Sequence, residues 1–573
     1  MGKRVLSALL VVLLLAAMAV TSLDQTRNIS SEQPSGDASD PEASSVDASK
    51  DELILWYADG AMTEFLEAAS LAYQAESGRH IRLENVSGVD YLEQINTASV
   101  YDGQEGPDGS KYEAPDLYLT SHDTLMRAYL AGLAMPITDP HEAVIPANFP
   151  ETAIRAVTCD EKRVGYPLYY ETNFFLYNKT YMQDIASAKV EEISDRAQGE
   201  AAQEAIDSGE TNPEEEKDTA TEDKAENKDT QKKDDRDKDG NGDDADAGKM
   251  DESDTQDGNE DPDGEETADG AGYAEEGEEG DPMGDEDVQA SPEVLKQLST
   301  MIPSTMDDIK NFANNYEAPE AVEAVFKWDV SDIFYNYFFV GNYMNVGGEN
   351  GDNNAIFNIY NRQAVECLQI YQDLNSFFSI DAKEVSYDKI LNEFLDGKTV
   401  FTVATTDAVP KIEDAKREGR FDFDYGISVL PNPSQTLRAG GLSMTTCIAV
   451  NGYSSQKDAA NDFASYLTME KGQELYRLAG HIASKRGCIY ENNEIYNIMN
   501  EYERSVPLPK MMETSNFWVQ LEIAMSKIWN GADPDETLKE LSETMGEQID
   551  EIDYHIPVQE TIGAGAGAMF LTK

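Results

Sequence analysis

The sequence has few cationic residues for its length. It contains 44 Lys and Arg residues against 111 Asp and Glu residues, and its net charge is -67 over 573 residues. Nucleic acids and anionic membrane surfaces repel a protein of this sign, so we expect neither as a partner. Much of the acidic excess lies in residues 186–290. The rest of the chain is long enough for two or three globular domains.

The patterns that carry most enzyme chemistry are also missing. The four cysteines include no C-x-x-C pair, which excludes a zinc or dithiol redox motif. Buried free thiols are the favoured interpretation, and a single disulfide bond is the alternative. There are five His and no G-x-S-x-G, H-E-x-x-H or P-loop motif. We therefore expect a protein that is not an enzyme and needs no cofactor. Carboxylates are abundant enough that a secreted glycoside hydrolase, which needs a pair of them, stays an alternative.

The N-terminus predicts export. Lys3 and Arg4 precede an apolar run that ends near an A-x-A cleavage pattern at Ala17–Ala19, so residues 1–23 are a predicted signal peptide or N-terminal membrane anchor. Residues 24–50 are rich in Ser, Asp, Glu and Pro and predict a disordered tether. We expect an extracellular protein that is held at the cell surface or released.

Strand and helix patterns alternate after the tether. The expected elements are strands at Leu53–Tyr57, near 81–86 and at 116–120, and helices at 63–76 and 123–130. This alternation predicts an α/β domain with a largely parallel sheet, whose ligands bind beyond the carboxyl ends of the strands. Asp59 and Asp123 follow two of these strands. Both residues could instead cap the helices that come next.

The run GYPLYYETNFFLYNKTYM, at residues 165–182, predicts a buried strand. It places one carboxylate, Glu171, among aromatic and apolar residues. Such a carboxylate is costly unless hydrogen-bond donors from the protein or from a ligand meet it.

Residues 186–290 predict a long disordered acidic insertion, with a frayed helix near 190–206, because they contain few apolar residues. A linker between domains is the alternative. Within it, Asp235, Asp237 and Asp239 match the start of an EF-hand calcium loop, but no amphipathic helices flank them. They are a weak calcium candidate, and we expect no metal site.

Further elements follow the insertion. We expect helical segments at 328–343, 362–378, 458–468 and 517–529, strands at 424–431 and 443–450, and a flexible tail at 553–573.

Several segments resemble, in their order along the chain, the extracellular solute-binding proteins of ABC importers, maltose-binding (carbohydrate) type. They are the hinge strand with Glu171, DLYLTSHDTLMRAYLAGLAMPIT, IPSTMDDIKNF, KWDVSDIFYNYFFVGNYMNVGG, FDYGISVLPNPSQTLRAGGLSMTTCIAV, and Asn516-Phe517-Trp518 before a helix. The resemblance covers nearly the whole chain apart from the leader, tether, insertion and tail.

The resemblance implies an α/β, two-lobed periplasmic-binding-protein-like fold of type II with a cleft between the lobes. The first lobe would take residues 51–169 and about 424–469. The second would take 172–402 and about 474–552, interrupted by the insertion at 186–290.

The resemblance also implies a ligand site, because carboxylates accept hydrogen bonds from sugar hydroxyls and aromatic rings stack on sugar faces. The expected ligand-binding residues are Asp59, Asp123, Glu171, Trp328, Tyr335 and Trp518. The two tryptophans could instead belong to the core. Maltose binders of the family have tryptophans where this chain has Thr120-Ser121 and Thr405-Thr406-Asp407, so the sequence departs from them at two platforms.

The implied function is capture of a sugar or oligosaccharide by hinge closure, for transfer to the membrane subunits of an ABC importer. We expect a monomer. A polyamine or other non-sugar solute on the same fold stays an alternative, as does the hydrolase.

Overall fold

The structure, a computed structural model, describes residues 52–88, 90–106, 109–138, 142–207, 290–511 and 516–553. The predicted leader and tether, the calcium candidate at Asp235, Asp237 and Asp239, most of the acidic insertion and the C-terminal tail lie outside these residues. Among the described helices, none combines the length and apolar character needed to cross a membrane.

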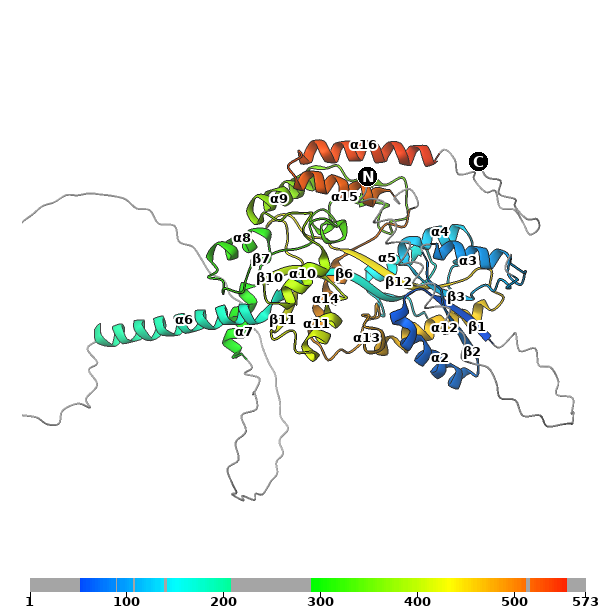
Figure 1. The fold of residues 1–573 in the computed structure, drawn as a ribbon, viewed down its shortest axis with the longest axis horizontal. Coiled ribbons are helices and arrows are strands. Elements are labelled where there is room, and N and C mark those ends of the chain that lie inside the picture. The colour runs from blue at the N-terminus through cyan, green and yellow to red at the C-terminus, as the bar shows by residue number, and fades with distance from the viewer. Residues whose placement is uncertain are drawn as a thin grey trace, which may run out of the picture.

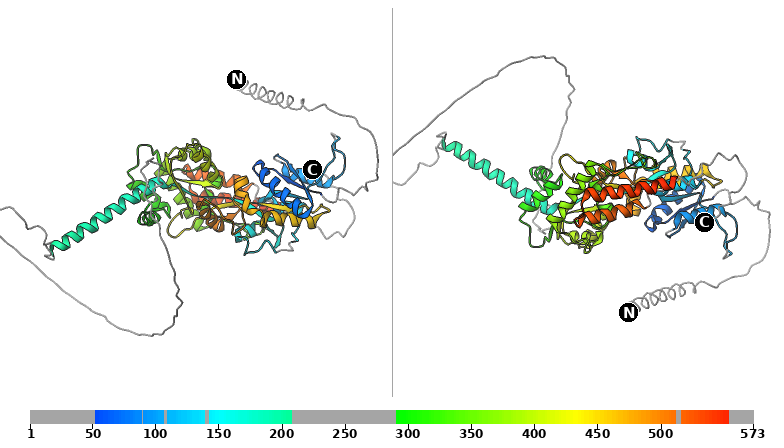
Figure 2. Two further views of the ribbon diagram at one scale, coloured as in Figure 1. Left: turned by 90° about the horizontal axis from the view of Figure 1, so that it is seen from below. Right: turned by 90° about the horizontal axis from the view of Figure 1, so that it is seen from above.

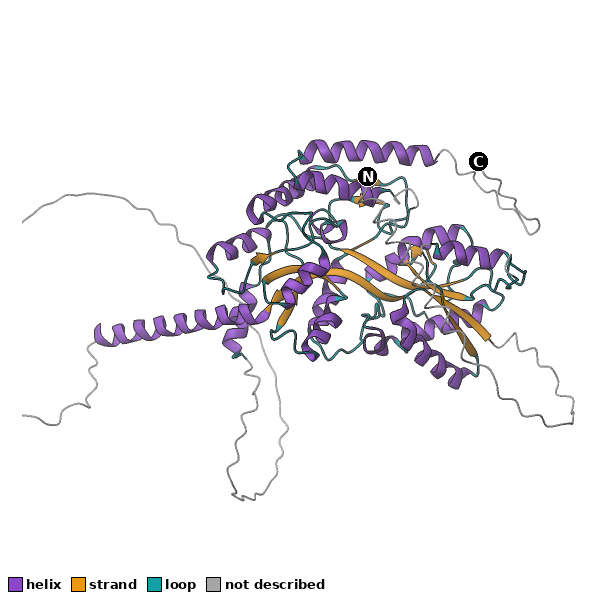
Figure 3. Cartoon of the chain, viewed as in Figure 1, coloured by secondary structure: helices purple, strands orange, loops and turns teal. Residues whose placement is uncertain are grey.

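One mixed sheet runs through the body of the molecule (Figures 1 and 3). Its order is β2-β1-β3-β12-β6-β10-β7, with β11 on β6 and β13 on β12. The strands are β1 (Glu52–Tyr57), β2 (His80–Asn85), β3 (Leu117–Ser121), β6 (Tyr166–Asn178), β7 (Ala324–Phe326), β10 (Thr399–Thr405), β11 (Tyr425–Ser428), β12 (Leu442–Val450) and β13 (Val506–Pro507). Two small hairpins are β4 (Thr158–Cys159) with β5 (Lys162–Arg163), and β8 (Asn345–Val346) with β9 (Phe357–Asn358). β1 is parallel to β2 and β3, as the alternating pattern predicts.

Helices cover the sheet. They are α2 (Thr63–Ser77), α3 (Tyr91–Val100), α4 (Leu125–Leu130), α5 (Glu151–Ala156), α6 (Lys179–Asp207), α7 (Pro292–Met301), α8 (Met306–Asn315), α9 (Arg362–Phe378), α10 (Tyr387–Leu395), α11 (Ala408–Arg417), α12 (Lys457–Met469), α13 (Leu475–Ala479), α14 (Glu494–Arg504), α15 (Phe517–Trp529) and α16 (Pro534–Asp553). α2 shows how the sequence sets their ends: Phe65, Leu66 and Ala69 form its buried stripe, and Gly78 closes it at φ 75°. The predicted helices at 63–76, 362–378, 458–468 and 517–529 are confirmed.

β6 is the strand that joins the two lobes, and we call it the crossing strand. Its first part, to Thr172, pairs with β12, and its second part, from Asn173, pairs with β10 and β11. One core cluster, the first lobe, gathers around β1, β3 and α2; another, the second lobe, gathers around α9 and α15. Only one residue of the crossing strand, Glu171, is not fully buried. The predicted two-lobed α/β fold is confirmed, and the residue boundaries of its lobes stay a prediction.

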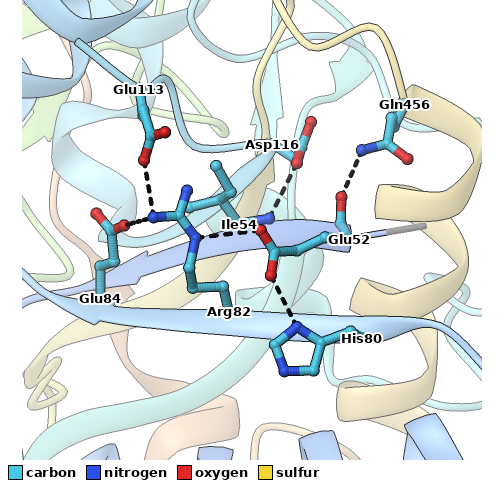
Figure 4. A network of polar contacts seen from close by, with 8 residues as sticks. All are labelled: Glu52, Ile54, His80, Arg82, Glu84, Glu113, Asp116 and Gln456. Atoms are coloured by element: carbon cyan, nitrogen blue, oxygen red, sulfur yellow. Dashed lines mark hydrogen bonds and ion pairs between the residues drawn. The ribbon is translucent and has the colours of Figure 1, made fainter. Parts of the chain in front are cut away.

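The outer edge of the first lobe carries a network of charged side chains (Figure 4). Arg82 of β2 places Nη1 2.7 Å from Glu84 and 2.8 Å from Glu113, and its Nε lies 3.4 Å from Glu52. Glu52 also meets His80 Nδ1 at 2.8 Å. One guanidinium therefore serves three carboxylates, and we call this the Arg82 network.

A frayed helix was predicted near residues 190–206 of the acidic insertion, and the structure places a helix across residues 186–207. They continue α6, which projects from the body in both views of Figure 2. The stretch is rich in Ala and Glu, which are good helix formers, and Arg196 pairs with Glu200 one turn on at 2.9 Å.

The predicted helical segment 328–343 is wrong. It contains two 3-10 turns, Ile333–Tyr335 and Tyr337–Phe339. Residues 335–340 are all buried, whereas a surface helix buries one stripe and exposes the other. The segment is a loop that passes through the second core.

Candidate functional site

Glu171 is the only carboxylate on the crossing strand, and it lies between charged groups from other elements. Burial raises its pKa; the His481 charge lowers it, and the charges of Asp407 and Asp59 raise it. Among the described residues, no side chain or backbone group makes a hydrogen bond or ion pair with this carboxylate. We call Glu171, Asp59, Asp407 and His481 the carboxylate cluster.

Asp59 follows β1 and is held from two directions. Its Oδ1 accepts the backbone N–H of Ala61 at 2.9 Å, which caps a short 3-10 turn. Its Oδ2 accepts from His481 Nε2 at 2.8 Å and from the Tyr169 hydroxyl at 3.3 Å. The hydrogen bond from His481 is the main cause that holds the pKa of Asp59 below its usual value. The rings of Tyr169 and His481 stack at 4.0 Å with 6° between their planes, so the pair forms one flat surface.

Asp407 follows β10, which pairs with the other part of the crossing strand. Its Oδ1 accepts from the Tyr387 hydroxyl at 2.8 Å and from Thr405 Oγ1, and its Oδ2 lies 2.6 Å from Lys411 Nζ. Burial acts to raise the pKa of Asp407, but these three donors outweigh it and hold the pKa below its usual value. Tyr335 stacks on Tyr387 at 4.9 Å.

The cluster therefore contains two carboxylates that have their own donors and one that receives none from the described residues. Asp59 and Asp407 are fixed in the charged state, and no described group donates to the oxygens of Glu171. A group of this kind accepts hydrogen bonds from hydroxyls or ammonium groups of a ligand. Tyr169 donates to Asp59, and Tyr335 stacks on Tyr387, which donates to Asp407.

Asp123 follows β3, and because β1 and β3 are parallel it lies at the same edge of the sheet as Asp59. Asp123 Oδ1 accepts a hydrogen bond from Ser121 Oγ at 2.5 Å, within its own loop. The preceding His122 is fully buried; its Nδ1 accepts the Thr445 N–H and its Nε2 donates to the Leu508 carbonyl. Burial lowers the pKa of His122 to about 4, so this histidine is neutral and holds the loop in place.

Trp328 was predicted to face the ligand, and this is wrong. Its side chain is fully buried, its indole N–H donates to Asn336 Oδ1 at 2.9 Å, and its ring stacks on Phe326 at 4.6 Å. It also meets Trp529 edge to face. With every surface of the ring in protein contact, Trp328 belongs to the second core.

The other two aromatic candidates differ from each other. Tyr335 is 8% exposed and reaches the cluster through Tyr387 and Thr405. Trp518 is half-buried at the start of α15, and its ring contacts are with Tyr337, edge to face at 5.3 Å, and Phe517. The structure thus joins Asp59, Glu171 and Tyr335 through shared neighbours and leaves Trp518 in a separate aromatic group.

Sequence reasoning missed His481, Asp407, Tyr169 and Tyr387. His481 is one of five histidines and follows Gly480 after a short helix, a pattern with no functional signature. Asp407 belongs to Thr405-Thr406-Asp407, where the sequence departs from the maltose binders by lacking a tryptophan. That departure did not indicate a ligand-binding residue.

Two cavities among the described residues lie away from the cluster. One of about 430 Å³ is lined by α5, residues 341–351 and residues 503–509. Another of about 880 Å³ lies between α6 and α8. Neither of these two cavities includes Glu171.

No family model matches the sequence, and no curated protein matches it. Solved structures do match the fold. The extracellular solute-binding protein from Staphylococcus aureus in complex with maltose is 16% identical with a TM-score of 0.59, over 88% of this chain and 98% of that one. A cyclo/maltodextrin-binding protein with maltotetraose gives 16% and 0.57, over 87% and 97%. The maltose-binding periplasmic protein from Listeria monocytogenes with maltose gives 14% and 0.53, over 89% and 100%. At these identities the likeness establishes the fold.

Proposed function

We propose that this chain is an extracellular solute-binding protein that captures a sugar or oligosaccharide between its two lobes for an ABC importer, and that it catalyses no reaction. The observation that carries the proposal is Glu171, a carboxylate on the crossing strand with no donor in the part of the chain that the structure describes. The fold supports it, since the matching solved structures are binding proteins described in complex with maltose or maltodextrins.

The chemistry of the cluster suits a ligand with many hydroxyl groups. Such a ligand donates to Glu171 and presents C–H faces to the Tyr169–His481 surface. Asp59 and Asp407 follow β1 and β10, strands that lie on opposite sides of the crossing strand in the sheet, so a ligand at Glu171 lies close to elements on both sides. Closure about the crossing strand then buries it.

We further propose Asp123 and Trp518 as ligand contacts made on closure, in lobes with the boundaries predicted above. The importer's membrane subunits are the proposed partners. Export by the N-terminal segment and a monomeric state complete the proposal.

A cationic solute such as a polyamine is the second candidate. The cluster has three carboxylates, and Lys411 is the only permanent cation among the described residues that pairs with them. Opposite charge across such a site strengthens binding of an ammonium ligand and makes it sensitive to salt.

A thermal-shift and calorimetry screen of the purified protein against maltose, maltodextrins, monosaccharides and polyamines tests both. A ligand that binds the native state raises the melting temperature. We expect a sugar to do so in the wild type and in Glu113→Gln, a matched carboxylate of the Arg82 network, and not in Glu171→Gln. A response to polyamines alone would transfer the proposal to the second candidate.

The proposal that no reaction occurs has its own test. We expect no turnover of chromogenic glycosides. Hydrolysis that Glu171→Gln abolishes would overturn this part and establish a hydrolase.

A further inference from the structure

Glu501 is a carboxylate buried beneath the crossing strand, away from the cluster. It lies on α14 with 2% of its surface exposed, and its Oε2 accepts the backbone N–H of Leu430, just past β11, at 3.0 Å. A buried carboxylate needs partners for both oxygens, and this bond serves one of them.

The same helix offers a close comparison. Glu494 lies seven residues earlier, about two turns along the same face. Its Oε2 accepts the N–H of Ile427 in β11 at 2.7 Å and a side-chain N–H from Asn497 at 3.1 Å, and it is partly exposed. Two carboxylates of α14 therefore hold one extended segment, and only Glu501 is cut off from water.

The second oxygen of Glu501 lies near another buried oxygen. A Cβ placed on Gly441 would press against Asn173 Oδ1 and would lie 2.8 Å from Leu430 Cδ1 and 3.3 Å from Glu501 Oε1, so both oxygens lie beside this glycine. Asn173 belongs to the crossing strand and is fully buried, and its Oδ1 has no donor among the described residues. Its Nδ2 is already used, since it donates to the Phe334 carbonyl at 2.7 Å.

Two acceptors that converge in a buried place repel unless a proton lies between them. The amide oxygen of Asn173 cannot carry that proton, and the carboxyl of Glu501 can.

The charged groups around the Glu501 carboxyl do little to stabilise its ionised form. Burial raises the pKa of Glu501 to about 7, against smaller effects of the Leu430 N–H and the Arg504 charge. β11 and β12 carry no charged residue, and on the crossing strand Glu171 takes part in the carboxylate cluster. On α5, Glu151 and Arg155 pair with each other at 3.4 Å.

We propose that the Glu501 carboxyl donates a hydrogen bond to Asn173 Oδ1, and that loss of this proton loosens the junction of α14, β11 and β12 with the crossing strand. The folded protein then holds a proton that the unfolded chain releases near the usual pKa of 4.5. Stability is greatest below that pH and falls as pH rises toward about 7. Because Asn173 is two residues from Glu171, the same proton steadies the crossing strand beneath the candidate site; this last step rests on the proposed function.

The test compares melting temperatures of the full chain from about pH 5 to pH 8 in wild type, Glu501→Gln and Glu494→Gln. Gln at 501 accepts from Leu430 and donates to Asn173 but cannot ionise. We expect the wild type to lose a few degrees across this range, Glu494→Gln to follow it, and Glu501→Gln to lose clearly less. An unchanged pH dependence in Glu501→Gln would overturn the proposal.

A second measurement needs no folded variant at position 501. In ¹³C-carboxyl NMR of the wild type, we expect a Glu resonance that titrates near pH 7 and that remains in Glu171→Gln. If no resonance outside Glu171 titrates above about pH 6, the proposal fails whatever the ligand screen shows.

Discussion

Two groups of three carboxylates in this molecule differ in how their charges are partnered. In the Arg82 network, Glu52, Glu84 and Glu113 surround one guanidinium at the exposed edge of β2 (Figure 4). In the carboxylate cluster, Asp59 and Asp407 each have their own donors, and Glu171 has none among the described residues.

The difference teaches which acidic residues in a very acidic protein point to function. Carboxylates that share a cation near solvent each contribute little to the free energy of unfolding. Their charges keep the edge strand from pairing with other chains. A largely buried carboxylate without a donor destabilises the folded state, and a ligand with donors removes that cost. The predictions below test this distinction, from the largest expected effect to the smallest.

Replacing Trp328 by Ala tests whether recognition depends on the second core instead of the cluster. We expect the free energy of unfolding to fall by about 3–5 kcal/mol, because the fully buried ring leaves a cavity. Denaturant unfolding measures this change. Trp328→Phe should fold and bind ligand with unchanged affinity; lost binding in this folded variant would make Trp328 a ligand contact after all.

Replacing Glu171 by Gln tests the uncompensated carboxylate directly. We expect ligand affinity to fall by about 2–3 kcal/mol, close to 100-fold, because a charged acceptor becomes a neutral one. The melting temperature without ligand should stay the same or rise, since the burial penalty disappears. Calorimetry measures the affinity and thermal unfolding measures the stability. A destabilised variant with normal affinity would show that Glu171 stabilises the fold and does not bind the ligand.

Replacing Arg82 by Ala leaves three carboxylates together without their cation. We expect a loss of about 1 kcal/mol in stability, larger at low salt, with ligand affinity unchanged. Chemical unfolding at two salt concentrations measures it. Arg82→Lys is the matched control, because it keeps the charge and loses the fork. A large effect of either variant on affinity would erase the distinction between the two groups.

Replacing Lys411 by Met removes the cation that pairs with Asp407 and leaves its Tyr387 and Thr405 donors in place. The pKa of Asp407 should rise, because its Nζ partner at 2.6 Å is gone, and stability should fall by less than about 1 kcal/mol. If the ligand is a sugar, affinity should change little; a polyamine should bind several-fold more tightly. Binding titrations at low salt separate these outcomes, and a weaker polyamine interaction would argue against the cationic candidate.

Local patterns predicted much of the fold. The strand at Leu53–Tyr57 and the helices at 362–378 and 517–529 match the structure because periodicity and end signals act over a few residues. The segment 328–343 failed because its aromatic residues suit a buried loop as well as a helix. The frayed helix predicted near 190–206 is present as the outer part of α6, because helix propensity also acts over a few residues.

The candidate site was predicted only in part. Asp59 and Glu171 stand beside strands that the sequence shows, so they could be proposed from local patterns. His481 could not, since it reaches Asp59 across 422 positions of the chain. Trp328 was misplaced because its ring could equally fill the second core, which the sequence does not display.

The sequence by itself determined a buried strand with one carboxylate in it, and α/β elements on either side, because those depend on neighbouring residues. Only the tertiary structure decided that Asp59 and Asp407 receive donors while Glu171 receives none from the described residues, and that Glu501 and Asn173 lie beside the same glycine. The physical reason is that the charge and pKa of a buried carboxylate depend on the groups within a few ångströms, and folding brings those groups from distant parts of the chain.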